Sequence, residues 1–448
     1  MKNTVSSFLI PSLVFSLFSQ LAFAHPEFPP GFRWCTATSA HQIEGGNTES
    51  DWWDWEQVPG HIKGDEKSGA AAGHWDRLAE DTLLLHNLNA TDYRMGIEWA
   101  KIEPREGEYD LAALTHYALE LTLLRAAGIT PIVTLSHFSI PRWFLARGGW
   151  AWDGAPEAFR KFTALSYDWY GSLVRDWITL NEPMVYVAAA YVGGVFPPGH
   201  TSLDEAESVV LGMVRAHAAA YHELHRLAAH EGRPVRAGVA HHLRAFDPKH
   251  KWNPMDRWAT KVVARIGNWT FPDAFATGRV KIKIPFFYSL DVEVPEAAGT
   301  QDFLGVNYYT RDLISFNLTR TPPFVQHVKK GAAVSDLGWE IYPDGLLRVL
   351  RDISARMPAG LPILITENGI ADAEDSRRPQ FLLDHLERVR IALDEKIPVE
   401  GYCHWSLLDN FEWAEGFGPR FGLIAVDYST MKRTPRPSAS VFAEKASP

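Results

Sequence analysis

Residues 111–138, LAALTHYALELTLLRAAGITPIVTLSHF, contain one complete helix-to-strand unit, and the rest of the chain repeats its pattern. Apolar residues recur there every three to four positions, as on one face of an amphipathic helix, at Leu114, Tyr117, Leu121 and Leu124. Gly128 follows where a helix C-cap is expected, and the apolar, partly β-branched run 130–137 comes next. The stretch predicts a helix that leads into a strand.

Similar short strand patterns alternate with helical patterns from about Phe28 to about Ala439, with no Gly/Ser-rich linker between them. Alternation of this kind predicts parallel strands, and eight of them predict a closed barrel. We therefore expect an α/β protein, a single (β/α)₈ TIM barrel over residues 25–448. The expected strands are Arg33–Ala40, Thr91–Ile97, Thr130–His137, Asp176–Leu180, Arg236–His242, Asp302–Tyr309, Pro362–Thr366 and Val399–Leu407.

The alternative is an open doubly wound sheet, which usually carries a Gly-rich phosphate turn after its first strand. Here that turn reads Gln-Ile-Glu-Gly-Gly at residues 42–46, which is not a phosphate cradle.

Composition excludes some classes of function. The 448 residues are 46% hydrophobic, enough for a large core, and carry a net charge of −10 without a basic stripe. Nucleic acid binding needs Lys and Arg to neutralise phosphates, so no nucleic-acid partner is expected. Most of the 17 Trp are expected in the core, and a minority beside carboxylates would suit sugar rings. The motifs imply no metal and no organic cofactor.

The N-terminus resembles a targeting segment. Lys2 precedes an apolar run from Phe8 to Leu21, and Ala22-Phe23-Ala24 offers small residues where a signal peptidase cleaves. The run is short and broken for a membrane anchor. We expect residues 1–24 to be a cleaved signal peptide, the mature protein to be secreted or periplasmic, and no membrane association after cleavage.

The two cysteines, Cys35 and Cys403, fall on the first and last expected strands, which are neighbours in a closed barrel. A bridge between them would be compatible with secretion. We nevertheless expect two unpaired buried thiols, because residues on adjacent strands seldom meet the geometry of a disulfide.

Polar or ionisable residues recur where each expected strand ends. Such ends share one face of a barrel, the face that carries the chemistry in barrel enzymes. Any one of these residues can be a satisfied structural group, but eight coincidences at one rim favour a functional site. They are Gln42, Arg94, His137, Asn181 with Glu182, His242, Tyr309, Glu367 and Trp405.

Two of these positions are glutamates, each next to an Asn in the sequence and followed by a Pro or Gly. Glu182 lies in Thr-Leu-Asn-Glu-Pro after the fourth strand, and Glu367 lies in Ile-Thr-Glu-Asn-Gly after the seventh. A single Glu there can simply start a helix. A pair of carboxyl groups on one rim instead suits glycosidic cleavage, in which one donates a proton and the other attacks or activates water.

Neighbouring residues suggest that the two carboxyl groups differ. Arg94 can keep one of them ionised, and Tyr309 can donate a hydrogen bond to the same group. The other glutamate, expected against apolar and aromatic walls, can stay protonated and serve as the acid. The residues alone do not show which glutamate is which.

The chain resembles the family 1 glycoside hydrolases, the β-glucosidase and β-galactosidase group, from about Phe32 to about Tyr428. The order of five motifs carries this resemblance. They are Thr-Ala-Thr-Ser-Ala-His-Gln-Ile-Glu-Gly at 36–45, Leu-Asn-Glu-Pro at 180–183, Val-Asn-Tyr-Tyr-Thr at 306–310, Ile-Thr-Glu-Asn-Gly at 365–369 and Trp-Ser-Leu-Leu-Asp-Asn-Phe-Glu-Trp at 405–413.

The resemblance implies a retaining, exo-acting β-glycosidase with Glu182 as general acid/base and Glu367 as nucleophile. It implies that Arg94 and Tyr309 support the nucleophile. The substrate would be a small-molecule or oligosaccharide β-glycoside. The sugar-contacting positions implied are Gln42, His137, Asn181, Tyr309, Trp405, Glu412 and Trp413, together with Phe421 and Trp339, for which a core role remains equally open.

Three positions depart from the family's pattern. Phe138 stands where Trp is common, His242 where Asn is expected, and Gly46 where Ala is usual. None of them is one of the two glutamates. The departure at His242 leads us to expect a different hydrogen bond near the acid/base or the sugar.

Three other functions stay open. An endo-acting barrel glycosidase should lack the end wall made by Glu412 and Trp413. A non-catalytic sugar-binding relative typically loses one catalytic carboxylate, and this chain keeps both. A 6-phosphosugar hydrolase would need cations where the chain has Ala-Glu-Gly at 414–416. The preferred sugar and the oligomeric state are not readable from the sequence.

Overall fold

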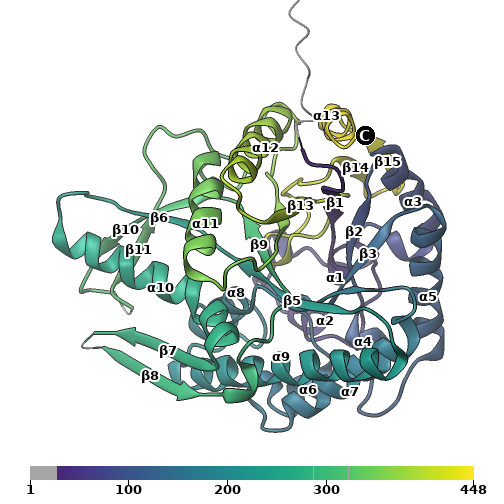
Figure 1. The fold of residues 1–448 in the computed structure, drawn as a ribbon, viewed down its shortest axis with the longest axis horizontal. Helices are drawn as coiled ribbons and strands as arrows, with labels where there is room; N and C mark the ends of the chain where they lie inside the picture. Colours follow the sequence, from purple (N-terminus) through teal and green to yellow (C-terminus); the bar gives the residue numbers. More distant parts are fainter. Residues whose placement is uncertain (1–27, 286, 321, 448) are drawn as a thin grey trace, which may run out of the picture. The chain divides into compact units, whose positions relative to one another are not determined.

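Eight parallel strands pair in a closed barrel in the order β1-β13-β12-β9-β5-β4-β3-β2 (Figure 1). The computed structural model describes residues 28–285, 287–320 and 322–447, so the predicted signal peptide lies outside the described residues. The predicted barrel is confirmed. Its strands are β1 (Arg33–Ala37), β2 (Asp92–Gly96), β3 (Thr130–Ser136), β4 (Asp176–Asn181), β5 (Arg236–His242), β9 (Phe303–Tyr308), β12 (Ile363–Asn368) and β13 (Val399–Trp405).

Helices follow the strands and surround the barrel. The expected helix in 111–126 is α5 (Leu111–Ala126), whose first turn is capped by the Asp110 carboxylate, 2.7 Å from the Ala112 amide nitrogen. Gly128 follows this helix at φ +78°, a backbone conformation that favours glycine. The other α-helices are α1 (Ala40–Ile43), α2 (Asp51–Trp55), α3 (Leu78–Asn87), α4 (Trp99–Ile102), α6 (Arg142–Ala146), α7 (Ala155–Tyr170), α8 (Pro183–Val187), α9 (Leu203–Glu231), α10 (Pro254–Thr277), α11 (Pro343–Arg356), α12 (Arg378–Asp394) and α13 (Pro437–Lys445).

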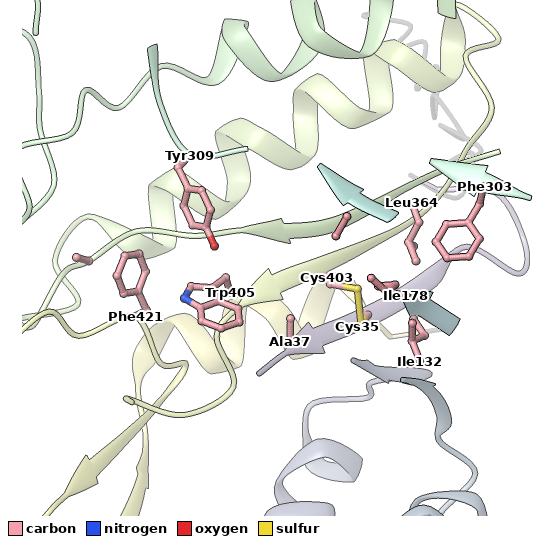
Figure 2. Close-up of a cluster of buried hydrophobic side chains, with 12 residues drawn as sticks. Cys35, Ala37, Ile132, Ile178, Phe303, Tyr309, Leu364, Cys403, Trp405 and Phe421 are labelled. Carbon is pink, nitrogen blue, oxygen red and sulfur yellow. A yellow bond between two sulfur atoms is a disulfide. The ribbon is translucent and has the colours of Figure 1, made fainter. Parts of the chain in front are cut away.

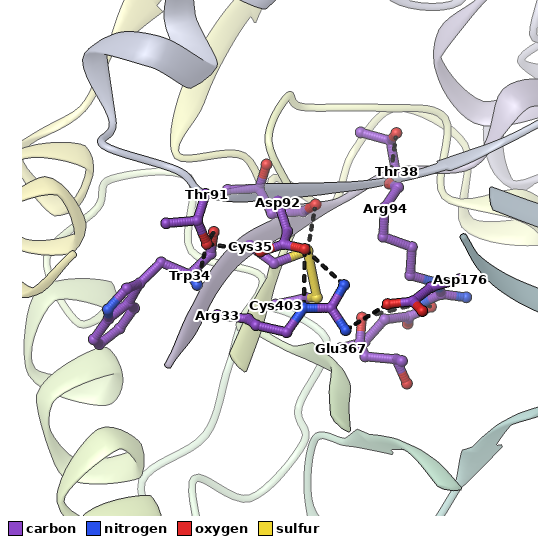
Figure 3. The surroundings of a disulfide bond; sticks show 12 residues. Arg33, Trp34, Cys35, Thr38, Thr91, Asp92, Arg94, Asp176, Glu367 and Cys403 are labelled. Carbon is purple, nitrogen blue, oxygen red and sulfur yellow. Dashed lines mark hydrogen bonds and ion pairs between the residues drawn. A yellow bond between two sulfur atoms is a disulfide. The ribbon is translucent and has the colours of Figure 1, made fainter. Parts of the chain in front are cut away.

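An ion-pair cluster lies at the start of the barrel strands. Arg33, the first residue of β1, pairs with Asp92 at 2.6 Å and with Asp176 at 2.7 Å (Figure 3). Arg236 and Glu400, at the starts of β5 and β13, pair at 2.6 Å. In barrel enzymes this end contributes stability, because catalysis takes place at the opposite face.

Above the ion pairs lies an apolar layer that contains a disulfide. Cys35 of β1 and Cys403 of β13 stand directly opposite each other, with Cα atoms 4.1 Å apart, and are joined as a disulfide. Our expectation of two unpaired thiols was therefore wrong. Figure 2 shows the bridge between a set of buried side chains at one end (Ile132, Ile178, Phe303, Leu364) and Tyr309, Trp405 and Phe421 at the other.

Three further sheets lie outside the barrel and were not expected from the eight-strand pattern. The largest joins β11 (Phe324–His327), β10 (Arg311–Phe316) and β6 (Ala245–Pro248), and lies with α10 on one side of the barrel (Figure 1). The other two are hairpins of β7 (Arg279–Ile284) with β8 (Tyr288–Glu293), and of β14 (Ile424–Asp427) with β15 (Lys432–Pro435).

Within the described residues, no helix combines the length and the apolar character that crossing a bilayer requires.

Candidate active site

Glu182 is placed by an irregularity at the end of β4. The register between β4 and β5 shifts between Ile178 and Asn181, and such bulges redirect the side chains that follow them. Glu182 then adopts a left-handed backbone conformation, φ +45°, before Pro183 starts α8. This conformation costs an L-residue roughly 1–2 kcal/mol, so the surrounding fold holds Glu182 in place.

Glu367 follows a second register shift. In β12 the pairing with β9 slips between Ile365 and Glu367. The next residue, Asn368, is fixed by its own hydrogen bonds, since its side-chain amide donates to the Tyr308 carbonyl at 2.7 Å. Gly369 is required by close packing, because a Cβ atom there would lie 1.8 Å from the Trp405 carbonyl oxygen.

The Glu367 carboxylate receives two strong donors. The guanidinium of Arg94, which is fully buried, donates to Glu367 Oε1. The Tyr309 hydroxyl donates to Glu367 Oε2 at 2.5 Å. Arg94 also donates to Asn181 Oδ1 at 2.6 Å, so one cation holds the nucleophile candidate and the residue before the other glutamate. Figure 3 labels Arg94 and Glu367 near the Cys35–Cys403 disulfide.

Asn307, on β9, contacts Glu182 and the neighbour of Glu367, and it was missed as a site residue from the sequence. Its side-chain nitrogen donates to Glu182 Oε1 at 2.8 Å and to Asn181 Oδ1 at 3.1 Å. Its side-chain oxygen accepts from the Thr366 hydroxyl at 2.6 Å. The available signal was its place in Val-Asn-Tyr-Tyr-Thr, where a buried strand residue is polar.

Glu182 does not face the apolar walls that we expected. Its Oε1 atom accepts from Asn307 and lies 3.0 Å from His242 Nδ1, at the end of β5. His242, one of the positions that depart from the family's pattern, therefore lies at this carboxyl group.

The two carboxyl groups affect each other's charge. Burial raises the pKa of Glu367 to about 7, and the charge of Glu182 adds to this, although Arg94 and Tyr309 oppose it. Burial also acts to raise the pKa of Glu182, but the His242 ring and the Asn307 amide outweigh it and leave the pKa below its ordinary value. The pair therefore shares its protons, and the contact with His242 affects which carboxyl group holds one.

A second polar group lies beside this pair. Gln42, on α1, donates to Glu412 Oε2 at 3.2 Å and to the Phe411 carbonyl at 2.9 Å. Burial raises the pKa of Glu412 to about 8, and the charges of Glu367 and Glu182 contribute to this rise. Glu412 is therefore close enough to the two glutamates for their charges to matter.

Aromatic rings surround the polar groups. The His137 ring lies nearly parallel to Trp405 and to Trp413, with centroids 5.8 and 6.0 Å away, and its Nε2 is 3.0 Å from the Asn181 amide nitrogen. Burial lowers the pKa of His137 well below its ordinary value, with Arg94 contributing, so the ring is neutral. On the other side, Tyr309, Trp339 and Phe421 contact one another.

A surface hollow of about 630 Å³ lies elsewhere, beside Glu44, Trp75 and Lys101. None of the site residues named above lines it. The Trp75 ring is already contacted by the Lys101 ammonium, 3.8 Å from its centroid, and by the stacked His116 ring at 3.7 Å. We therefore place the chemistry at the two glutamates and not in this hollow.

Comparisons with known proteins identify the family. Residues 24–447 match the model of glycosyl hydrolase family 1. β-Glucosidase A of Thermotoga maritima is 32% identical over 431 residues, covering 91% of this chain and 95% of that protein.

Two solved structures are similar throughout. A β-glycosidase from Pyrococcus horikoshii superposes with a TM-score of 0.86 at 35% identity, covering 94% of this chain and 95% of that one. The Thermotoga maritima β-glucosidase in complex with castanospermine gives a TM-score of 0.86 at 29% identity, over 94% and 98% of the two chains. The chain belongs to glycosyl hydrolase family 1 and is a β-glycosidase.

Proposed function

We propose that the protein is a retaining, exo-acting β-glycosidase of β-glucosidase type that works by double displacement. The observation that carries the proposal is the pair Glu182 and Glu367, two buried carboxyl groups from different strands joined through Asn307, Asn181 and Arg94. A retaining mechanism needs two carboxyl groups on opposite sides of one anomeric carbon, with one able to attack and the other able to exchange a proton.

The contacts of Glu367 with Arg94 and Tyr309 support its proposed role as the nucleophile. Glu367, held by Arg94 and Tyr309, attacks the anomeric carbon while Glu182 gives its proton to the departing glycosidic oxygen. This forms a glycosyl ester on Glu367 and releases the alcohol. Glu182 then takes a proton from water, whose oxygen attacks the same carbon and breaks the ester. Two inversions at that carbon preserve the β configuration.

The proposed intermediate gives a direct test. A 2-deoxy-2-fluoro-β-glucosyl fluoride slows both steps but keeps a good leaving group, so the glycosyl-enzyme should accumulate. We expect time-dependent inactivation and one labelled peptide that contains Glu367, identified by mass mapping after proteolysis. A label on any other carboxyl group would contradict the assignment of the nucleophile.

We further propose exo action, because Glu412 lies near the glutamate pair and Trp413 lies beside His137, where both could bind the hydroxyl groups of a terminal sugar. Charge-assisted hydrogen bonds contribute roughly 1.5–3 kcal/mol each. Glu412→Gln should therefore lower kcat/KM for an aryl β-glucoside about 10- to 100-fold.

Glu415→Gln is the matched control for Glu412, because Glu415 lies on the same loop and pairs with the exposed Lys63 at 3.0 Å. It should keep the wild-type kcat/KM. Equal losses in the two variants would contradict a sugar-binding role for Glu412.

Export is also proposed, with residues 1–24 as a cleaved signal peptide and a secreted or periplasmic mature protein. The disulfide between Cys35 and Cys403 supports this proposal, because such bonds persist mainly in oxidising compartments.

A further inference from the structure

His242 connects the acid/base candidate to residues outside the barrel. It is the last residue of β5, and its side chain is only 10% exposed. Its Nδ1 atom lies 3.0 Å from Glu182 Oε1, and its ring lies nearly parallel to that of Tyr309 with centroids 5.8 Å apart. Its other nitrogen, Nε2, lies 2.6 Å from Arg244 Nε.

Arg244 determines which nitrogen of His242 carries a proton. The guanidinium of arginine has only donors and stays protonated in proteins. Because Arg244 Nε donates to His242 Nε2, this nitrogen must be the acceptor, and the single ring proton lies on Nδ1. The imidazole is therefore neutral and donates to Glu182 Oε1.

Arg244 is itself held by elements outside the barrel. Its Nη1 donates to Asp312 Oδ2 on β10 at 2.8 Å. The side chain of Asn268, on α10, holds the backbone of Arg244. It accepts from the Arg244 amide at 3.1 Å and donates to the Arg244 carbonyl at 2.9 Å. These contacts keep the cation directed at His242 and leave its charge paired with Asp312.

The arrangement also distinguishes the two oxygens of Glu182. His242 Nδ1 and Asn307 Nδ2 both converge on Oε1, so a proton on this carboxyl group belongs on Oε2. A positively charged imidazole would instead hold Glu182 as a carboxylate, which cannot protonate a leaving group. Burial acts to raise the pKa of Glu182, and a positive charge on His242 acts to lower it.

We propose that Arg244, acting through His242, is a positioning residue that keeps the imidazole neutral and so lets Glu182 carry the acid proton on Oε2. The proposal rests on the proposed acid/base role of Glu182. Other charged or titratable groups act on this pair from the neighbouring elements, but Arg244 is the one placed on His242 Nε2. These others are Arg94 (β2), His137 (after β3), Tyr309 (after β9), Asp312 (β10), Glu367 (β12) and Glu412 (after β13).

The test compares two substrates that differ in their need for an acid. 2,4-Dinitrophenyl β-glucoside has a leaving group that departs without a proton, whereas phenyl β-glucoside needs one. Arg244→Gln removes the positive charge and introduces an acceptor oxygen on a shorter side chain, so His242 Nε2 can take a proton. We expect this variant to lose about 10-fold more kcat/KM on the phenyl than on the dinitrophenyl substrate.

A double-mutant cycle separates this effect from simple loss of structure. In the His242→Asn background there is no imidazole to charge, so adding Arg244→Gln should leave the phenyl to dinitrophenyl ratio unchanged. Arg348→Gln, which removes another arginine beside the same outer sheet, is the matched control, since Arg348 pairs with Asp247 at 2.9 Å. It should leave the ratio at the wild-type value.

¹⁵N-histidine NMR gives a readout independent of turnover. With the His242 signals assigned from His242→Asn, we expect Nε2 without a proton in the wild type at pH 6, and with a proton in Arg244→Gln. Three results would each overturn the proposal. The first is an equal loss of Arg244→Gln on both substrates, and the second is the same effect of Arg244→Gln in the His242→Asn background as in the wild type. The third is a protonated Nε2 in the wild type. If Glu182→Ala loses kcat/KM equally on the two substrates, the proposed acid/base role of Glu182 is wrong, and the proposal for Arg244 is not what the result contradicts.

Discussion

Replacing Glu367 by glycine is expected to lower kcat for β-glucoside hydrolysis by about 10⁵-fold or more, because the proposed covalent intermediate forms on this carboxyl group. Azide or formate should then restore turnover of an activated aryl glucoside, since a small anion can enter the space left by the side chain. The anion attacks once, so the glucosyl product should have the α configuration. Product analysis by NMR with azide present measures both expectations.

Glu340→Gln is the control for this experiment. Glu340 is also buried and also paired with an arginine, at 2.6 Å from Arg311, but it lies outside the barrel strands. It should remain active and gain nothing from azide. A β-configured azide product from Glu367→Gly would show that a covalent intermediate still forms, and the nucleophile would have to be assigned elsewhere.

Replacing Glu182 by alanine should give a loss that depends on the leaving group. General acid catalysis contributes about 10²- to 10⁴-fold, and only poor leaving groups need it. We expect kcat/KM for phenyl β-glucoside to fall by roughly that factor, while the value for 2,4-dinitrophenyl β-glucoside changes little. Steady-state rates on a series of aryl glucosides of rising leaving-group pKa measure the dependence.

Glu182→Gln refines this test, because the amide keeps the shape and can still meet the donors of Asn307 and His242 after a rotation. It cannot give up a proton as an acid, so it should show the same leaving-group dependence as Glu182→Ala. A uniform loss across the series in both variants would assign Glu182 a structural role instead.

Much of the fold was predictable because the barrel strands are short, mostly buried runs with a polar residue at or near the end of most of them. The polar residue at each strand end also pointed to the rim that carries Arg94, Asn181, Glu182 and Glu367. The register shifts in β4 and β12 were not predictable, since a bulge depends on pairing with a distant strand.

Other contacts could not be predicted because their two residues lie far apart in the sequence. Asn307 meets Glu182 across 125 residues, and Arg244 reaches Asp312 across 68, so no local pattern marks either contact. The sheet of β6, β10 and β11 consists of four- to six-residue strands outside the barrel, too short to stand out from loops. The thiols of Cys35 and Cys403 were misjudged because their exact register was unknown.

That bridge between Cys35 and Cys403 spans 368 positions and ties the first strand of the ring to the last. A protease that cuts the backbone once anywhere between them would therefore produce a nicked molecule, not two free fragments. The pieces would stay tethered at high effective concentration and could re-form the same sheet. If the protein is exported as proposed and meets proteases, the disulfide would keep a molecule that is cut in an exposed loop in one piece.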